Sequence, residues 1–286
     1  MANKERKIDK YYSVNRRFLK NVMRNLVIWE GLPDSIDERA LNDYLLFQGF
    51  AAGFYYKGEL IVAEGSLAGL DHYYRPTWYT CSNAKITPVQ RRRIGVGCCI
   101  CYNTPNYQFP ESFNNIIDLY AWRLADISLS EEVSIRNSRA AYVPLVKDEK
   151  EALRFSRLMN EVYEGDSFAI GYKLPIGTNA KDVFLPMSAR ENLVVDLLSD
   201  ARRCTMADFF SSLGVKTIAV DKKERTNLLE MDSDSQQRKI TSDIIMKPRE
   251  RWCREMNERF GTNISVRFNE EEVQKNGILL ENEAGR

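Results

Sequence analysis

Apolar residues recur at three- and four-residue steps in two long segments, residues 113–139 and 191–213, and this spacing predicts a helix in each. Gly214 follows the second segment as a residue that can close a helix with a positive φ. Residues 140–190 alternate strand-like and helical patterns, which predicts a small α/β lobe. The pattern therefore predicts a long helix, an inserted lobe and a long returning helix. The apolar positions of the second helix are Val194, Leu197, Leu198, Ala201, Thr205, Phe209 and Leu213.

The first long helix carries two apolar stripes on roughly opposite sides. One contains Phe113, Ile116, Ile117, Tyr120, Leu124 and Ile127, and the other contains Leu119, Trp122, Leu129 and Val133. An ordinary surface helix has a single stripe. Two stripes indicate two packing partners, such as the helix's own chain and a neighbouring copy in a ring or bundle. Full burial inside one large monomer is the alternative.

The first 112 residues predict a separate region of helices and short strands. Phe18, Val22, Leu26 and Trp29 have helical spacing, and a second helix capped by Asp34 or Ser35 presents Leu41, Leu45 and Leu46 to the interior. From Gly49 to Pro110, glycines and alternating aromatic and β-branched residues predict a small sheet. The triplet 91–93 (RRR) is expected on a turn, where it either meets an acidic partner or phosphate or is simply solvated.

Residues 221–243 are rich in charge and predict a long irregular connection, which in a compact domain is usually functional or disordered. Pro248 is expected in the first turn of the next helix, with Trp252, Met256 and Phe260 on its inner side. Gly261 ends that helix, and residues 264–268 alternate as a strand does. The tail from residue 270 is acidic and polar.

Composition limits the function. The chain has 286 residues, with 41 basic and 40 acidic groups and a net charge of +1. A general phosphate-binding surface normally shows a basic excess, so contact with nucleic acid must be local or weak. No apolar run approaches the roughly 20 residues of a membrane helix, and the charged N-terminus lacks a signal-peptide core. Assembly in a cytoplasm without a membrane partner is expected.

The candidate chemistry is sparse. Cys98, Cys99 and Cys101 lie in an apolar run (GVGCCICYN) that predicts a buried strand, and His72 is the only histidine. This set does not supply the four nitrogen or sulfur ligands of a zinc site, so the cysteines are expected to be reduced and to pack as small hydrophobes. No phosphate-binding loop, nucleophile elbow or zinc-protease motif occurs. We therefore expect no catalytic residue, no cofactor and no metal.

Several blocks in this order resemble the head–tail connector (upper collar, or portal) proteins of small short-tailed bacteriophages, over residues 15–268. The resemblance is carried by WEGLP (29–33), FQGFAAGFYYKG (47–58), AYVPL, YEGDSFAI (163–170), FFSSLGVK, VDKKER (220–225) and KPRERWCREMNERFGTNISVRF (247–268). It implies an α+β, ring-forming subunit of portal type. The segments are then an N-terminal wing (1–112), a stem helix (113–139), a clip lobe (140–190), a second stem helix (191–213), a channel loop region (214–246) and a wing or crown with the C-terminal tail (247–286).

The resemblance also implies the function. A homododecameric ring at one vertex of the phage head would surround a channel for double-stranded DNA, which passes through it during packaging and ejection. The partners would be the packaging ATPase, the major capsid and scaffolding proteins, the lower collar and tail proteins, and a packaging RNA. The virion is the expected location.

Site residues follow from the same resemblance. The channel loop would contact DNA through Lys222, Lys223, Arg225, Arg238 and Lys239, and a basic N-terminus would bind RNA through Lys4, Arg6 and Lys7. The net charge of only +1 agrees with a channel through which DNA slides, because many phosphate contacts would bind the duplex too tightly for it to move. Leu185 and Leu197 occupy positions where relatives carry channel lysines.

Two other functions remain open from the sequence. A ring-forming capsid or tail adaptor would share the helical plan without touching DNA. A magnesium-dependent DNA-processing enzyme would use some of the many carboxylates, although no spaced carboxylate pair stands out.

Overall fold

The computed structural model describes residues 6–81, 83–138, 142–144, 149–150, 152–153, 156–157, 184–186, 194–215 and 228–269. The chain divides into two compact units. Unit 1 contains residues 1–12 and 123–202, and unit 2 contains residues 13–122 and 203–286. The boundary crosses three helices, so each helix contributes turns to both units.

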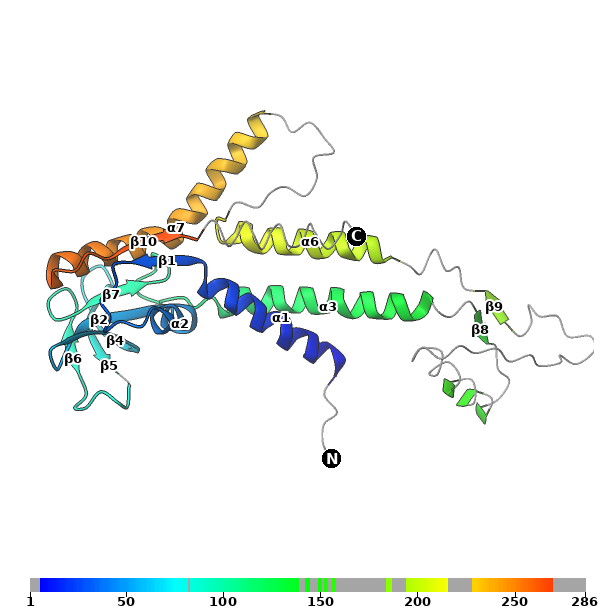
Figure 1. The fold of residues 1–286 in the computed structure, drawn as a ribbon, viewed down its shortest axis with the longest axis horizontal. Coiled ribbons are helices and arrows are strands. Elements are labelled where there is room, and N and C mark those ends of the chain that lie inside the picture. The colour runs from blue at the N-terminus through cyan, green and yellow to red at the C-terminus, as the bar shows by residue number, and fades with distance from the viewer. Residues whose placement is uncertain are drawn as a thin grey trace, which may run out of the picture. The chain divides into compact units, whose positions relative to one another are not determined.

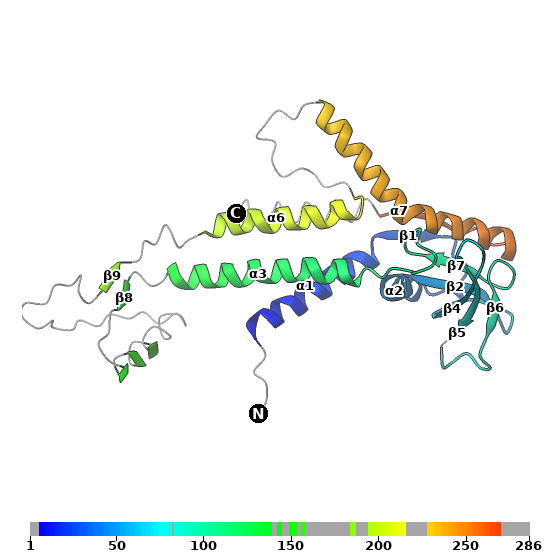
Figure 2. The same ribbon diagram turned by 180° about the vertical axis from the view of Figure 1, so that it is seen from behind.

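The two predicted long helices are confirmed as α3 (Asn114–Ser138) and α6 (Val195–Ser212), which run side by side in opposite directions (Figures 1 and 2). In unit 1, the Ser134 hydroxyl accepts the Val194 backbone N–H at 3.2 Å. In unit 2, the rings of Tyr120 and Phe209 meet edge to face at 5.3 Å. Gly214 has a φ of +72° and follows α6 as predicted.

Between these helices, the predicted strands of the inserted lobe are confirmed in part. β8 (Tyr142–Pro144) pairs antiparallel with β9 (Phe184–Pro186). Leu185 therefore lies on a strand, opposite Val143. The expected strand at residues 167–174 lies outside the described residues.

The N-terminal region departs from the sequence prediction in two places. α1 spans Lys7–Arg24, and residues 27–30 form a strand, β1 (Val27–Glu30), in place of the predicted last helical turn. The helical spacing of Trp29 was misleading because β1 is held by pairing with β10 (Ser265–Phe268), a partner remote in sequence. α2 (Glu38–Gln48) is capped by Asp37, whose carboxylate accepts two backbone N–H groups, so the predicted caps Asp34 and Ser35 are wrong.

Short strands follow as the sequence predicts, but they form two three-stranded antiparallel sheets in place of the one small sheet expected. β2 (Phe50–Tyr56) is central between β3 (Glu59–Ala63) and β7 (Cys99–Tyr102). β5 (Pro76–Cys81) is central between β4 (Gly65–Leu70) and β6 (Arg91–Arg93). The arginine triplet is thus a strand paired with β5, and its predicted turn is wrong. Phe54, Tyr79 and Cys98 are fully buried where the two sheets share a core.

The largest correction concerns α7 (Leu228–Phe260), which begins well before the predicted start at Pro248. The prediction of irregular chain is therefore wrong for residues 228–243. Leu, Glu, Met, Gln, Arg and Lys, which are frequent there, favour helix on propensity alone. Pro248 lies inside the helix, and α7 bends visibly between its two halves (Figure 1). Proline causes such a bend because it lacks the N–H that an interior helical bond requires.

The carboxyl-terminal half of α7 packs on the β2–β7 side of the first sheet. Trp252 and Met256 are fully buried, as predicted, and the Trp252 indole N–H donates to the Cys99 carbonyl at 3.3 Å. Gly53 of β2 allows this approach, since a Cβ there would lie 2.8 Å from the Met256 sulfur. This half of α7 is therefore fixed to the sheet by close packing.

Candidate nucleic-acid interface

The amino-terminal half of α7 carries the part of the predicted DNA-contacting set that the structure describes. Lys239 is exposed on this helix, next to Ile240, which is 65% exposed. Arg238 belongs to the same helix, but its side chain lies outside the described set, as do Lys222, Lys223 and Arg225. Lys239 is therefore the one predicted DNA-contacting residue for which the structure describes a side-chain position.

A second exposed lysine on this half of α7 is neutralised locally. Lys247 forms an ion pair with Asp243 at 2.7 Å, one helical turn away. Such exposed pairs contribute little to stability, but they reduce the charge that a passing phosphate would meet. The exposed charge of Lys247 is therefore partly neutralised within its own helix.

α7 is held at its middle by contact with the end of α6. A Cβ at Gly214 would lie 2.3 Å from the Ser242 backbone nitrogen, so only glycine allows the two backbones to approach this closely. The positive φ of Gly214 adds a second reason for glycine, because other residues adopt that conformation at a cost of roughly 1–2 kcal/mol.

Just after the proline bend, a buried arginine fixes α7 to the sheet and to the start of α3. Arg249 is 4% exposed, and its guanidinium donates to the Asn103 side-chain oxygen at 2.6 Å, the Asn103 carbonyl at 3.2 Å and the Ile245 carbonyl at 2.6 Å. The Asn103 amide in turn donates to the Glu111 carbonyl at 3.1 Å. Burial lowers the Arg249 pKa, and none of these acceptors is a carboxylate.

This cluster is not among the sites predicted from the sequence. Arg249 follows a proline in a charged stretch that looks like a solvated face, and Asn103 lies 146 residues away. No local pattern identifies such a pair. The structure shows that it joins α7, the end of β7 and the chain leading into α3.

Two of the three predicted N-terminal cations form ion pairs within the protein. Arg6 pairs with Asp9 at 3.2 Å, and Lys7 pairs with Glu132 of α3 at 2.7 Å. Tyr11 also donates to Glu132, at 2.9 Å. These hydrogen bonds hold the pKa of Glu132 below its usual range, and the one from Lys7 makes the largest contribution. Lys4 lies outside the described residues. Lys7 therefore has a structural role beside any contact with RNA.

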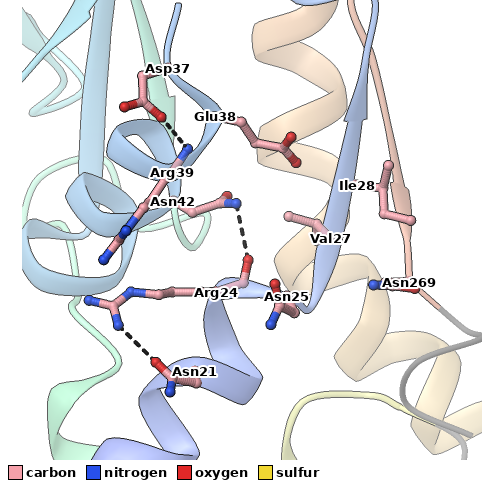
Figure 3. Close-up of a pocket in the computed structure, with 10 residues that line it drawn as sticks. All are labelled: Asn21, Arg24, Asn25, Val27, Ile28, Asp37, Glu38, Arg39, Asn42 and Asn269. Carbon is pink, nitrogen blue, oxygen red and sulfur yellow. Dashed lines mark hydrogen bonds between the residues drawn. The ribbon is translucent and has the colours of Figure 1, made fainter. Parts of the chain in front are cut away.

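A polar cleft of about 620 Å³ lies where α1, β1 and α2 meet (Figure 3). Arg24 donates to the Asn21 side chain at 3.0 Å, and the Asn42 amide donates to the Arg24 carbonyl at 3.1 Å. Asparagines, two arginines and two acids provide most of the lining. Cofactor pockets are predominantly apolar, so this cleft does not have the lining of such a site.

The cysteines behave as predicted. Five of the six are buried, and all are free thiols. Burial raises the pKa of Cys98, Cys99 and Cys253 to about 12, so they remain protonated at neutral pH. Among the residues that the structure describes, no three His, Cys, Asp or Glu side chains are grouped to hold a metal ion. Nor does any described helix have the length and apolarity needed to cross a membrane.

Comparison with solved structures gives several likenesses of low identity, including the following three. The chain is similar to a chain from the portal and tail of native bacteriophage P68, with 20% identity, a TM-score of 0.49, and coverage of 99% of this chain and 98% of that one. A chain from the virion of a native gene transfer agent particle matches with 12% identity, a TM-score of 0.41, and coverage of 98% and 88%. An HK97 family phage portal protein from Corynebacterium diphtheriae matches with 13% identity, a TM-score of 0.42, and coverage of 92% and 93%.

The family comparison is broader and carries the assignment. The match to the family model described as Phage Connector (GP10) extends over residues 2–273. It includes both long helices, both three-stranded sheets and the whole of α7. The chain therefore belongs to the phage connector (GP10) family.

Proposed function

We propose that this connector assembles as a homododecamer around a channel that conducts double-stranded DNA into the phage head and out again. Family membership makes the protein a structural component of the virion, a head–tail connector in an oligomeric ring with capsid and tail proteins as neighbours. The dodecamer, the DNA contacts, the packaging ATPase and the packaging RNA belong to the proposal.

One observation supports ring assembly most directly. The second apolar stripe of α3 is only partly covered by the described residues: Leu119 is 50% and Val133 46% exposed. The opposite stripe is buried, with Ile117 at 0% and Leu124 at 1%. Exposed apolar stripes of this kind mark interaction sites, and a neighbouring copy in the ring would cover this one.

Ring assembly can be tested by placing charge on that stripe. Leu119→Lys and Val133→Lys should leave the subunit folded, because both side chains are already about half exposed, but should shift the purified protein from rings to smaller species. Glu250→Lys, an exposed position on α7, is the matched control. Negative-stain microscopy and mass in solution provide the readout, and rings that persist in both stripe variants would contradict this interface.

The DNA-conducting role rests on the charged segment before and within α7. Its cations are Lys222, Lys223, Arg225, Arg238 and Lys239. A few cations per subunit, repeated around a ring, would touch passing phosphates, while their acidic neighbours limit the salt-dependent affinity that many contacts produce.

Genome retention distinguishes a DNA conduit from an adaptor that never meets DNA. Lys239→Glu combined with charge reversal at Lys222 and Lys223 should preserve ring assembly but reduce the fraction of packaged DNA that stays in the head. Arg254→Glu, on the exposed side of the sheet-bound half of α7, should have no such effect. Normal packaging and retention in the triple variant would favour the adaptor function.

A further inference from the structure

The edges of the small sheets differ in how their outward backbone groups are satisfied. At the edge of β3, the Ser35 hydroxyl donates to the Leu60 carbonyl at 2.6 Å. At the edge of β6, the Arg93 carbonyl accepts the Gly97 N–H at 2.9 Å. β1 directs the Trp29 N–H toward the Glu38 carboxylate at 3.4 Å. Capping of this kind protects sheet edges from pairing with other chains.

β4 is a sheet edge that lacks such a cap. The Cys81 N–H donates to the Gln90 carbonyl, and the Thr77 carbonyl accepts the Ile94 N–H, each at 2.9 Å. Thr77, Tyr79 and Cys81, the alternate residues of β5, therefore direct their backbone groups toward β6. The intervening residues, Trp78 and Thr80, must bond toward β4, where they face Ala68 and Ser66. Leu67, between these two, therefore points its N–H and C=O away from the sheet. Within the described part of the chain, neither group has a hydrogen-bond partner, and no strand pairs with this edge.

The strand itself is suited to accept another strand. β4 reads GSLAGL, without charge or proline, and four of its six residues are exposed. An uncharged, exposed edge strand is a template for β-strand addition, in which main-chain bonds supply affinity and neighbouring side chains supply specificity.

The side chains on the outward face of this sheet have one sign of charge. Ser66, Thr80 and Arg91 lie side by side on this face, as do Ala68, Trp78 and Arg93. The Arg91 guanidinium lies 4.8 Å from the centre of the Trp78 ring, a cation–π contact that holds it over the middle strand. Neither Arg91 nor Arg93 has an ion-pair partner among the described residues, and five basic residues but one acidic residue lie between positions 65 and 93.

We propose that the outer edge of β4 is a docking site for an extended acidic segment of another protein, which adds to the sheet as a further strand. An added strand would lie about 10 Å from β5, two strand spacings away. A glutamate side chain extends over part of that distance, above the small Ser66 and Ala68, and the long Arg91 side chain, which lies over Trp78 of β5, supplies the rest. Alternate side chains of the segment would face the other way, beside the half-buried Leu67.

Duplex DNA fits the same surface less well. It carries no alternating N–H and C=O groups to match the free backbone edge, and it favours longer basic stripes than two arginines provide. This docking site is independent of the proposed channel, because none of the channel cations belongs to this sheet.

The test uses the full-length protein and a short capped peptide in which glutamate alternates with valine, labelled for fluorescence anisotropy. The same peptide with N-methyl groups on the residues facing β4, and a version with lysine in place of glutamate, should both fail to bind. Arg91→Gln with Arg93→Gln should weaken binding about tenfold or more, as expected for loss of charge-assisted hydrogen bonds. Arg254→Gln serves as the exposed-arginine control.

A pair of variants isolates the backbone edge. Leu67→Pro removes the outward N–H without removing a bond to β5, and proline is tolerated at such edge positions. Leu67→Ala removes the same side chain and keeps the N–H, so it should bind the peptide while Leu67→Pro should not. If Leu67→Pro fails to fold, the N-methylated peptide still tests the edge.

Three results would overturn the proposal. The first is an absence of peptide binding, and the second is binding that survives N-methylation of the peptide. The third is DNA binding at the same salt concentration that depends on Arg91 and Arg93, which would assign this face to nucleic acid.

Discussion

The buried Arg249–Asn103 pair leads to an asymmetric prediction: removing the neutral partner should cost more stability than removing the charged one. Asn103 is fully buried, and its side-chain oxygen accepts from Arg249 at 2.6 Å. Asn103→Leu deletes that acceptor while the guanidinium remains 4% exposed. Leaving a buried charged donor without its acceptor costs about 3 kcal/mol or more, and we expect Asn103→Leu to lose about this much.

Arg249→Met should be milder because it removes the charge together with its desolvation penalty. What remains is a buried asparagine oxygen without its donor, a loss of about 1–3 kcal/mol, offset in part by the gain from no longer burying an ion. The double variant, with both positions apolar, should be close to Arg249→Met alone. The cost of the double variant should therefore be lower than the sum of the two single costs by about 2 kcal/mol or more, which is the coupling energy of the pair.

Urea unfolding at one fixed protein concentration measures these differences, with tryptophan fluorescence as the probe. Trp29 and Trp252 meet edge to face at 5.4 Å within the same unit as Arg249, so their emission reports on this core. Asn115→Leu, at an exposed position near the start of α3, controls for the chemical change and should alter stability by at most about 0.5 kcal/mol. Equal costs for the two single variants, or strictly additive costs in the double variant, would refute the reasoning.

Three further predictions concern other parts of the chain. Gly214→Ala should destabilise the α6–α7 junction by about 2 kcal/mol or more, because a Cβ meets the Ser242 backbone and positive φ disfavours alanine; thermal unfolding, with Gly58→Ala as a positive-φ control in open space, measures the difference. The lowered pKa of Glu132 means that its stabilising contribution is complete above the ordinary value of 4.5 and is lost as the pH falls through the lower folded-state pKa; hydrogen exchange along α1 should then accelerate in acid, and Glu132→Gln should abolish that transition. A maleimide at neutral pH should label Cys204, the exposed thiol, and leave the five buried ones unmodified; labelling that persists in Cys204→Ser would contradict this.

The sequence predicted most reliably the elements whose apolar period is sustained over many turns. The helices α3 and α6 are examples, since the buried stripe of α3, with Ile117 and Leu124, has a period that only a helix can place on one face. The exposed stripe with Leu119 was equally visible in the sequence. These features depend on local order along the chain and need no knowledge of distant partners.

The errors occurred where long-range pairing decides local structure. β1 exists because β10 pairs with it, so the helical spacing that included Trp29 carried no information about the strand. The Arg91–Arg93 triplet is a strand because β5 is adjacent. The Arg249–Asn103 contact joins residues 146 positions apart, and no local pattern indicates it.

The error in α7 alters the proposed interface itself. A continuous helix places Lys239 about 13 Å before Pro248 along the axis, at 1.5 Å per residue, rather than on an irregular loop. The bend at Pro248 is followed at once by Arg249, which is fixed to Asn103, while Gly214 contacts the helix at Ser242. Lys239 is therefore attached to a helix that is held at two points. If Lys239 contacts the duplex as proposed, force on its side chain would be transmitted along the helix to these two contacts, which Gly214→Ala and Asn103→Leu weaken.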